Sequence, residues 1–374
     1  MLTTLELERY RGFERYRLSG LTRVNLLVGK NNCGKTSLLE AVHLIVSGGD
    51  PRVLNSTAWH RGEVVYTAGG REEYRQEGFP CVSHFFHGHE LRVGAYFAVR
   101  SSDGFGEVTV RVVEVYVPDE ILERAYRNQG LDTLDTSLGI RFEGSAAFVA
   151  GESQGLPVSA EGVFLPGVVY GPGRVSPSER REVARVLFIA PDSLEPRSMG
   201  AMWNRVISER RESEVIRAMR ILAPDLTDIF FLSGENAYRH GGHAGILAAF
   251  EGTQHRHPLG SHGDGMRRLL ALSLSLTQAE GGVLLVDEID TGLHYSIMGD
   301  MWRLVTEAAR RSNVQVFATT HSSDCVRGLA WLCENHPDLA KDVSLQKIDC
   351  ELEEAVALHG EEIVLAVNQG MEVR

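Results

Sequence analysis

The sequence has few cysteines and no long apolar run. Its 374 residues include five cysteines, Cys33, Cys81, Cys325, Cys333 and Cys350, and no two of them form a CxxC pair. An odd number of scattered cysteines argues against a disulfide framework and against a structural zinc site. No apolar stretch approaches the roughly 20 residues that a membrane-spanning helix needs. The charged first dozen residues also argue against a signal peptide, so we expect a cytoplasmic protein that has no membrane partner.

Positive charge is also in deficit. Lys+Arg total 38 against 50 Asp+Glu, which gives a formal net charge of −12. Because duplex affinity comes largely from cations set against phosphates, this balance argues against a uniformly basic nucleic-acid surface, though not against a local basic groove. Two of the few lysines, Lys30 and Lys35, lie in one short stretch. The composition, 43% hydrophobic and 24% charged, is that of a globular protein.

Strand-like and helix-like segments alternate towards both ends of the chain. We expect strands at 24–28, 282–287, 314–319 and 342–348 and helices at 35–46, 264–279, 295–311 and 322–334. This rhythm is typical of a parallel sheet with crossover helices. In the middle we expect loop with a short helix at 52–78, short strands with one helix near 119–127, and a helical stretch at 198–223.

The fold class that follows is α/β, with a core that is interrupted along the chain. We predict that 1–50 and 250–374 form this discontinuous core. Residues 51–194 would form a mostly β lobe, and 195–249 a helical insertion that returns to the core.

One segment, Gly29-Lys30-Asn31-Asn32-Cys33-Gly34-Lys35-Thr36-Ser37, contains the pattern GxxxxGK[ST]. It follows a strand of buried type and begins a helix, which is the context that a phosphate-binding loop requires. Glycines let the backbone curl so that successive N–H groups face a polyphosphate, and the helix N-terminus adds its dipole. Lys35 would contact the β- and γ-phosphates, and Thr36 would bind Mg²⁺. An ordinary glycine-rich turn between strand and helix is the less favoured alternative.

Two later strands end in side chains suited to the same chemistry. One ends in Asp287 and Glu288, where Asp287 would lie near Mg²⁺ and Glu288 could polarise an attacking water. His321 follows the next strand, and because ligands approach an open α/β sheet at these strand ends, it could bond the γ-phosphate. Each residue alone is weak support, since many strands end in a solvated acid and many histidines are structural.

A second anion site is expected at Ser261-His262-Gly263, directly before the helix at 264–279. One chain needs only one phosphate cradle. The second cradle therefore suggests that Ser261 and Gly263 serve the nucleotide of another subunit.

In this order the motifs resemble those of an ABC-type ATPase, and more narrowly those of the RecF/SMC/OLD branch. The resemblance rests on the opening LELERYRGFERYRLSGLTRVNLLVGKNNCGKTSLLEAV and on VLLVDEIDTGLHYS and ATTHSSD, and covers about 1–48 and 257–325. It implies a P-loop ABC-type ATPase core with an antiparallel β lobe and a helical insertion, using ATP and Mg²⁺. We find no long coiled coil of the SMC kind and too few residues after 349 for a TOPRIM domain. The chain therefore looks like a stand-alone OLD-like ATPase.

The resemblance also implies roles for the matching residues. Lys35, Glu288 and His321 would be catalytic. Thr36 and Asp287 would hold the metal, and Asp290 would lie in the D-loop. The nucleotide would be bound by Gly29, Asn31, Asn32, Cys33, Gly34, Lys35, Thr36 and Ser37 and, across a dimer interface, by Ser261 and Gly263. The signature departs from the usual LSGGQ, because Ser261-His262-Gly263-Asp264 stands in its place.

Other polar clusters have simpler interpretations. His84, His87 and His89 could ligate a metal, but their mixture with phenylalanines favours a structural role. Arg11 and Phe13 could touch nucleotide or DNA, and the sequence does not distinguish these roles. Arginines interleaved with glutamates favour a solvated helix with internal ion pairs over a nucleic-acid or partner surface. These arginines are Arg205, Arg210, Arg211, Arg217 and Arg220.

The resulting expectation is an ATP-hydrolysing switch. Two subunits would enclose two ATP–Mg²⁺ and loosen after hydrolysis, as a homodimer or a higher oligomer built from dimers. Because no effector domain is visible, a separate nuclease or toxin of an OLD-like or antiphage system would supply the output. Three alternatives stay open: a RecF-like repair ATPase that binds DNA across the closed dimer, a slow ATP-dependent scaffold, and a transporter ATPase subunit.

Overall fold

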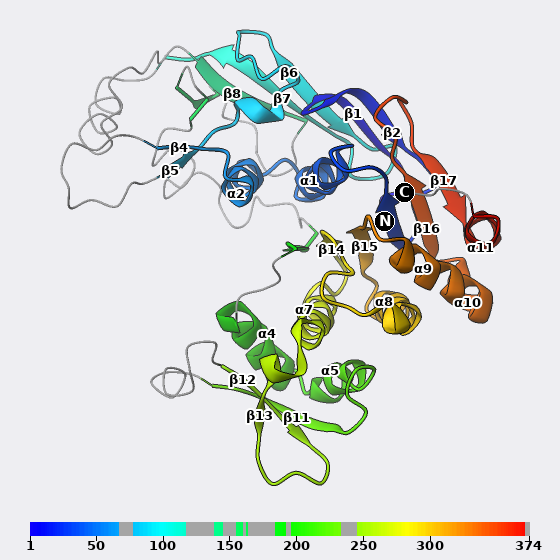
Figure 1. Ribbon diagram of the computed structural model, residues 1–374. Coiled ribbons are helices and arrows are strands. Elements are labelled where there is room, and N and C mark those ends of the chain that lie inside the picture. The colour runs from blue at the N-terminus through cyan, green and yellow to red at the C-terminus, as the bar shows by residue number, and fades with distance from the viewer. Residues whose placement is uncertain are drawn as a thin grey trace.

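The computed structural model describes residues 1–66, 78–116, 138–144, 155–159, 162–163, 184–191, 196–232 and 245–370. Two six-stranded sheets dominate it, with helix α1 (Lys35–Val46) between them (Figure 1). The expected helix near 119–127 lies outside the described residues. Within the described residues, no helix is both long and apolar enough to cross a bilayer.

The first sheet is the core sheet, in the order β10-β14-β15-β3-β16-β17. Its strands are β3 (Val24–Val28), β10 (Val186–Ile189), β14 (Val283–Val286), β15 (Gln315–Thr319), β16 (Val343–Lys347) and β17 (Val356–His359). All neighbours pair in parallel except β16 and β17, which are antiparallel. The α/β fold with a parallel sheet is confirmed.

Every residue of β3, β14 and β15 is buried, as expected for parallel strands covered on both faces. Leu27, Leu285 and Phe317 pack in the cluster that includes α1, whereas Leu26, Leu284 and Val316 pack in the cluster on the other face. On that face lie α7 (Asp264–Gln278), α8 (Met298–Arg311), α9 (Ser323–Asn335), α10 (Pro337–Ala340) and α11 (Gly360–Asn368). Helices α7, α8 and α9 and strands β14, β15 and β16 agree closely with the predicted ranges, whereas α10, β17 and α11 were not predicted.

The second sheet is antiparallel, in the order β2-β1-β6-β7-β8-β9. Its strands are β1 (Leu5–Tyr10), β2 (Phe13–Leu18), β6 (Tyr96–Arg100), β7 (Glu107–Glu114), β8 (Leu138–Glu143) and β9 (Leu156–Pro157). Leu5 and Leu7 alternate with Glu6, which is exposed, and Glu8, which is half-buried, so one face of the sheet is apolar and covers α1. The domain boundaries stay a prediction. In the sheets themselves, β1 and β2 join the lobe strands, and β10 joins the core.

Between the two sheets the chain forms elements that the sequence described only loosely. Helix α2 (Pro51–Arg61) occupies much of the segment expected to be loop, because Asp50 caps it and Pro51 fits its first position. It is followed by the short pair β4 (Val64–Tyr66) and β5 (Gly78–Pro80) and the 3₁₀ turn η1 (Ser83–Phe85).

Between β10 and α7 the chain forms two helices, a small sheet and a 3₁₀ turn. The helices are α4 (Pro196–Ser208) and α5 (Glu212–Met219). The sheet contains β11 (Leu226–Phe231), β12 (Ile246–Phe250) and β13 (His257–Pro258), and the turn is η2 (Leu259–His262). The single stretch expected at 198–223 is broken at Arg210, whose φ is +57°. A left-handed residue ends one helix and redirects the chain into the next.

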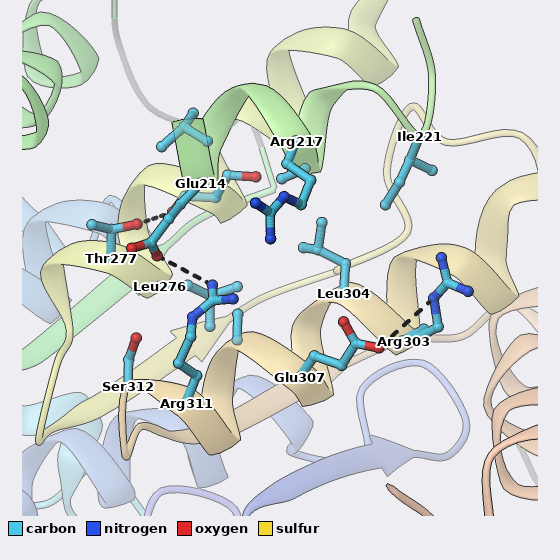
Figure 2. Close-up of a pocket in the computed structure, with 14 residues that line it drawn as sticks. Glu214, Arg217, Ile221, Leu276, Thr277, Arg303, Leu304, Glu307, Arg311 and Ser312 are labelled. Carbon is cyan, nitrogen blue, oxygen red and sulfur yellow. Dashed lines mark hydrogen bonds and ion pairs between the residues drawn. The ribbon is translucent and has the colours of Figure 1, made fainter. Parts of the chain in front are cut away.

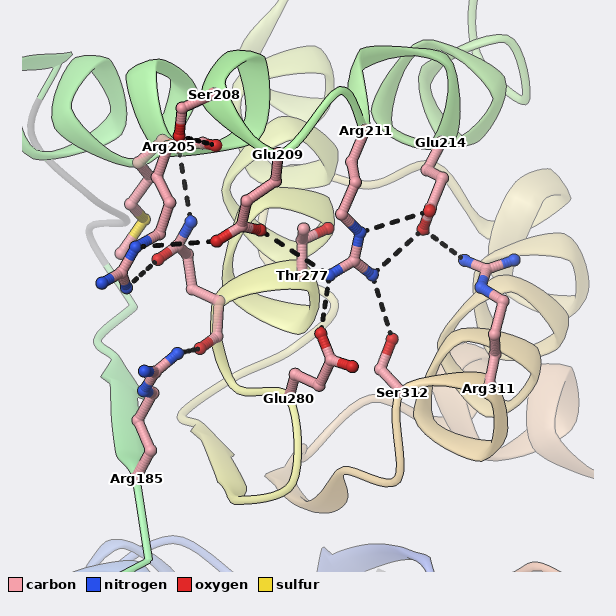
Figure 3. A network of polar contacts seen from close by, with 12 residues as sticks. Arg185, Arg205, Ser208, Glu209, Arg211, Glu214, Thr277, Glu280, Arg311 and Ser312 are labelled. Carbon is pink, nitrogen blue, oxygen red and sulfur yellow. Dashed lines mark hydrogen bonds and ion pairs between the residues drawn. The ribbon is translucent and has the colours of Figure 1, made fainter.

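Ion pairs hold the insertion against the core (Figure 3). Arg211 donates to Glu280 at 2.8 Å and to Glu214 at 3.2 Å, and Arg205 donates to the Gln278 side chain at 2.8 Å. A cavity of about 130 Å³ remains between α5, α7 and α8. Leu276 and Leu304 line it, together with charged pairs such as Arg303 and Glu307 (Figure 2). The contacts of Arg211 support the ion-pair interpretation, and Arg205 also lies 3.9 Å from the Glu209 carboxylate.

His43 on α1 gives the protein a predictable sensitivity to acid. Burial lowers the pKa of this imidazole to about 4, against an ordinary value near 6.5. As pH falls from about 6.5 to about 4, His43 becomes protonated in the unfolded chain but stays neutral in the folded chain. The free energy of unfolding therefore falls across this window. At ~1.4 kcal/mol per pKa unit, the loss is roughly 3 kcal/mol.

In urea titrations at several pH values, His43→Gln should lose less stability in this window than wild type. Exposed His255→Gln is the control, and equal pH slopes for wild type and His43→Gln would contradict the assignment.

Candidate nucleotide site

The loop between β3 and α1 is closed on itself in a way that only glycine permits. Gly29 (φ +152°) is packed so that a Cβ would lie 2.4 Å from the Ile348 carbonyl oxygen. Gly34 (φ +88°) faces Phe13, whose ring would lie 2.3 Å from a Cβ. The Lys35 ammonium donates to the carbonyl oxygens of Gly29 (2.7 Å) and Lys30 (2.9 Å). Lys35 is therefore folded over the loop, with its charge held where a phosphate would lie.

The start of α1 is suited to an anion. Gly34 is its N-cap and has no side chain with which to cap the first turn. The free N–H groups of a first turn carry a partial positive charge, which favours phosphate. Beside this turn, burial raises the pKa of the Cys33 thiol, which keeps that group neutral next to Lys35.

Oxygen atoms from two elements meet at the end of β14. The Thr36 hydroxyl donates to the Asp287 carboxylate at 3.0 Å, and the Thr319 hydroxyl donates to the same carboxylate at 2.5 Å. One carboxylate and one or two hydroxyls are hard ligands of the kind Mg²⁺ takes when phosphates supply the rest. No cluster of three or more His, Cys, Asp or Glu suited to a metal occurs among the described residues. The oxygens of Asp287, Thr36 and Thr319 fit a magnesium ion shared with phosphates.

Glu288 and His321 lie beside this oxygen cluster. Glu288 has a φ of +49°, and its backbone N–H donates to the Thr319 hydroxyl at 2.8 Å. Its carboxylate lies 3.6 Å from the His321 Nδ1 atom, and both side chains are well exposed. A left-handed backbone is uncommon for a residue that is not glycine, and such strain is concentrated at functional sites. The pair presents a carboxylate and an imidazole to the cavity.

Arg268 on α7 fixes the backbone behind Glu288. Its side chain is 1% exposed and donates to the carbonyl oxygens of Asp287 (2.6 Å), Glu288 (2.7 Å) and Ala190 (2.8 Å). The sequence placed this arginine on an amphipathic helix without a role. The sequence feature that could have revealed its role is a positive charge on the apolar face of that helix, where Leu269, Leu270 and Leu272 are also buried.

A polar network forms the opposite wall of the site. Arg11 is 7% exposed and lies between Glu40 and Glu63, each at 2.7 Å, with the Phe85 ring 4.2 Å from its guanidinium. Arg61 pairs with Glu40 at 2.5 Å and donates to the Ser37 hydroxyl at 3.1 Å. Burial raises the pKa of the Glu40 carboxyl, and the two arginines act against that rise.

These walls enclose a cavity of about 630 Å³. The predicted residues that line it are Asn31, Asn32, Cys33, Gly34, Lys35, Thr36, Ser37, Asp287, Glu288 and His321. Arg11 and Phe13 line it too, and whether they contact nucleotide or DNA stays open. The cavity is also lined by six residues that the sequence did not assign to it: Arg61, Glu63, His84, His89, Thr319 and Cys350. Thr319 lies in the ATTHSSD motif, and His84 and His89 were considered only as metal ligands or structural residues. The other three belong to no local motif.

Ser261 and Gly263 lie elsewhere. Neither residue is among the described residues that line the cavity. Both are exposed, directly before α7. Two residues on, a Cβ at Gly265 would lie 2.8 Å from the Gly292 carbonyl oxygen. The signature turn is thus exposed beside the loop that contains Asp290, and it does not line its own chain's cavity.

Comparison with known proteins gives two kinds of match in sequence. A sequence model of the family described as "AAA domain, putative AbiEii toxin, Type IV TA system" matches residues 206–324. The DNA replication and repair protein RecF of Acinetobacter baylyi is 49% identical over 47 residues. That match spans 13% of this chain and 13% of the relative's own length. An uncharacterized protein of Methanocaldococcus jannaschii is 38% identical over 47 residues, 13% of this chain and 22% of that protein.

Solved structures match over nearly the whole chain at low identity. An SMC head bound to the C-winged helix domain of ScpA is 13% identical with a TM-score of 0.48, covering 96% of this chain and 98% of that one. The recombination mediator protein RecF-ATPrS of the RecFOR pathway is 14% identical with a TM-score of 0.40, covering 96% and 98%. The order of the motifs resembles that of an ABC-type ATPase of the RecF/SMC branch. The resemblance found in the sequence is confirmed at that level.

Proposed function

We propose that this protein is an ATP-hydrolysing switch that dimerises around ATP–Mg²⁺ and controls a separate effector. One observation carries the proposal: Lys35, Asp287 and Glu288 converge on one cavity, while the signature turn is exposed outside it. A site that holds phosphate, metal and a catalytic carboxylate, yet leaves a second anion-binding turn unused, is suited to a two-subunit arrangement.

The chemistry follows from the cavity residues. Lys35 and the first turn of α1 would bind the phosphates, and Thr36 with Asp287 would hold Mg²⁺. The ion would neutralise charge developing on the phosphate oxygens. Glu288 would orient the attacking water, and its backbone is hydrogen-bonded to Thr319 and Arg268. His321, 3.6 Å from that carboxylate, would bond the terminal phosphate and register its loss.

The exposed signature turn supports a symmetric dimer. In an isologous pair, the same turn from each copy would approach the phosphate loop of the other. The Ser261 hydroxyl of one copy would then contact the nucleotide bound by the other copy. The N-terminal dipole of α7 would stabilise the same phosphates. Hydrolysis would remove the anion that joins the two copies, and the dimer would loosen.

The effector is proposed as a separate protein, a nuclease or a toxin, as in OLD-like and antiphage systems. The match to a family described as a putative AbiEii toxin of a Type IV TA system supports a role of this kind. The match to RecF supports a second candidate, a repair ATPase that binds DNA across the closed dimer. ATP-dependent DNA binding by the protein alone, weakened steeply by salt, would favour this second candidate.

The test compares two lysines of one loop. Lys35→Ala should abolish phosphate release and the mass increase that ATP produces in light scattering, because its ammonium contacts the phosphates. Lys30→Ala is the matched control and should retain both, since the Lys30 side chain is exposed and its carbonyl oxygen is the atom that contacts Lys35. Equal phosphate release by wild type and Lys35→Ala would refute the proposal.

A further inference from the structure

The cavity is larger than a phosphate chain needs, and its surplus lies against the antiparallel lobe. The residues there are Arg11, Gly12 and Phe13 from the β1–β2 turn and His84 and His89 from the segment that follows β5. The sequence favoured a structural role for the histidines. The structure divides them, because His84 and His89 line the cavity, whereas the His87 ring is bound to the Arg11 carbonyl oxygen at 2.9 Å.

This histidine segment is held firmly to the lobe. Phe85 and Phe86 are fully buried beneath it. The Arg11 N–H donates to the Phe85 carbonyl oxygen at 2.9 Å, and the His87 N–H donates to the Arg9 carbonyl oxygen at 3.0 Å. The His84 and His89 rings lie 5.2 Å apart at 65° to each other. Two aromatic rings are thus presented to the cavity from a fixed backbone.

A continuous path of contacts joins the phosphate end to these rings. Ser37 in the first turn of α1 contacts Arg61, and Arg61 and Arg11 share Glu40. The Arg11 guanidinium then lies 3.5 Å from the His84 carbonyl oxygen. The path joins the start of α1 to the histidine segment.

The direction of a bound nucleotide follows by elimination. The terminal phosphate must lie beside Glu288 for a water to attack it, and the other phosphates must follow the loop and the start of α1. The sugar and base then extend over the remaining wall, which contains Gly12, His84 and His89. A Cβ placed on Gly12 would meet no atom within 4 Å, so the space above this turn is open to a flat ring.

We propose that His84 and His89, together with the open turn at Gly12, form the binding surface for the base and ribose of the nucleotide. Imidazole rings stack on a base, and their nitrogens both donate and accept hydrogen bonds, which suits a purine edge. The antiparallel lobe thereby makes the site select a nucleoside triphosphate over a bare polyphosphate. This inference rests on the proposed function, since it concerns the same site.

The experiment is calorimetric titration with two probes, Mg-ATP and Mg-tripolyphosphate. The double variant His84→Ala/His89→Ala should bind ATP about tenfold more weakly or worse, because base stacking contributes ~1–3 kcal/mol and 1.4 kcal/mol is tenfold. Its affinity for tripolyphosphate should be unchanged, which also shows that the variant is folded. Glu90→Ala, an exposed neighbour outside the described cavity lining, should match wild type with both probes.

The outcomes separate the two proposals. Unchanged ATP affinity in the double variant, with tripolyphosphate bound normally, overturns the role of the histidines and leaves the proposed function standing. Equal loss of both probes in the double variant also overturns that role, because the phosphate end would then be affected. Failure of wild type to bind either probe overturns the proposed function, and the inference with it.

Discussion

Glu288→Gln is expected to lower multiple-turnover phosphate release by about 10²–10⁴-fold, the usual contribution of a general base. Glutamine has nearly the same shape but cannot accept the proton or carry the negative charge that orients water. ATP binding should persist, because Lys35, Thr36 and Asp287 are unaltered and the Glu288 backbone remains held by Thr319 and Arg268. The measurement is steady-state phosphate release alongside ATP affinity by calorimetry.

The same variant should accumulate as an ATP-bound dimer, since binding is retained and the step that releases the partner is blocked. Light scattering should show a doubled mass with ATP and a single mass without it. Adding Ser261→Arg in this background should restore the single mass while ATP affinity changes little, because Ser261 lies outside its own chain's cavity lining. A Glu288→Gln protein that turns over ATP at the wild-type rate would remove this carboxylate from the mechanism.

Arg268→Gln is expected to lower the free energy of unfolding by about 3 kcal/mol or more. The buried guanidinium donates to three carbonyl oxygens, those of Ala190, Asp287 and Glu288. Each buried acceptor that loses its donor costs about 1–3 kcal/mol. Urea unfolding measures the change. Turnover should also fall more than ATP affinity, because the Glu288 backbone loses a contact that fixes its left-handed conformation.

The neighbouring Arg267→Gln is the matched control. Arg267 lies on the same helix but is exposed, and it pairs with Asp264 in the first turn. An exposed ion pair contributes about 0–1 kcal/mol, so this variant should unfold close to wild type and hydrolyse ATP normally. If the two variants lose equal stability, or if Arg268→Gln retains the wild-type turnover number, Arg268 does not support Glu288.

Much of the core could be predicted because its signals are local. The ranges of β3, α1, α7 and β15 follow from apolar periodicity and from capping and glycine signals within a few residues. A short helix was expected within 52–78, but the bounds of α2 were not, because its burial pattern depends on packing between two sheets that its own sequence does not reveal. The break at Arg210 was missed because a left-handed arginine has no sequence signal.

The sequence by itself determined the chemistry of the site: a phosphate-binding loop, an acidic pair after a strand, and a histidine after the next strand. These are contiguous motifs, and parallel strands bring their ends to one edge of the sheet. Only the tertiary structure decided what surrounds them. Asp287 meets Thr319, Arg268 supports Glu288, and His84 reaches the cavity from the antiparallel lobe. Residues so distant along the chain meet because the two sheets and the insertion pack on shared helices. Packing between separate elements produces no regular spacing in the sequence, so it cannot be predicted from local patterns.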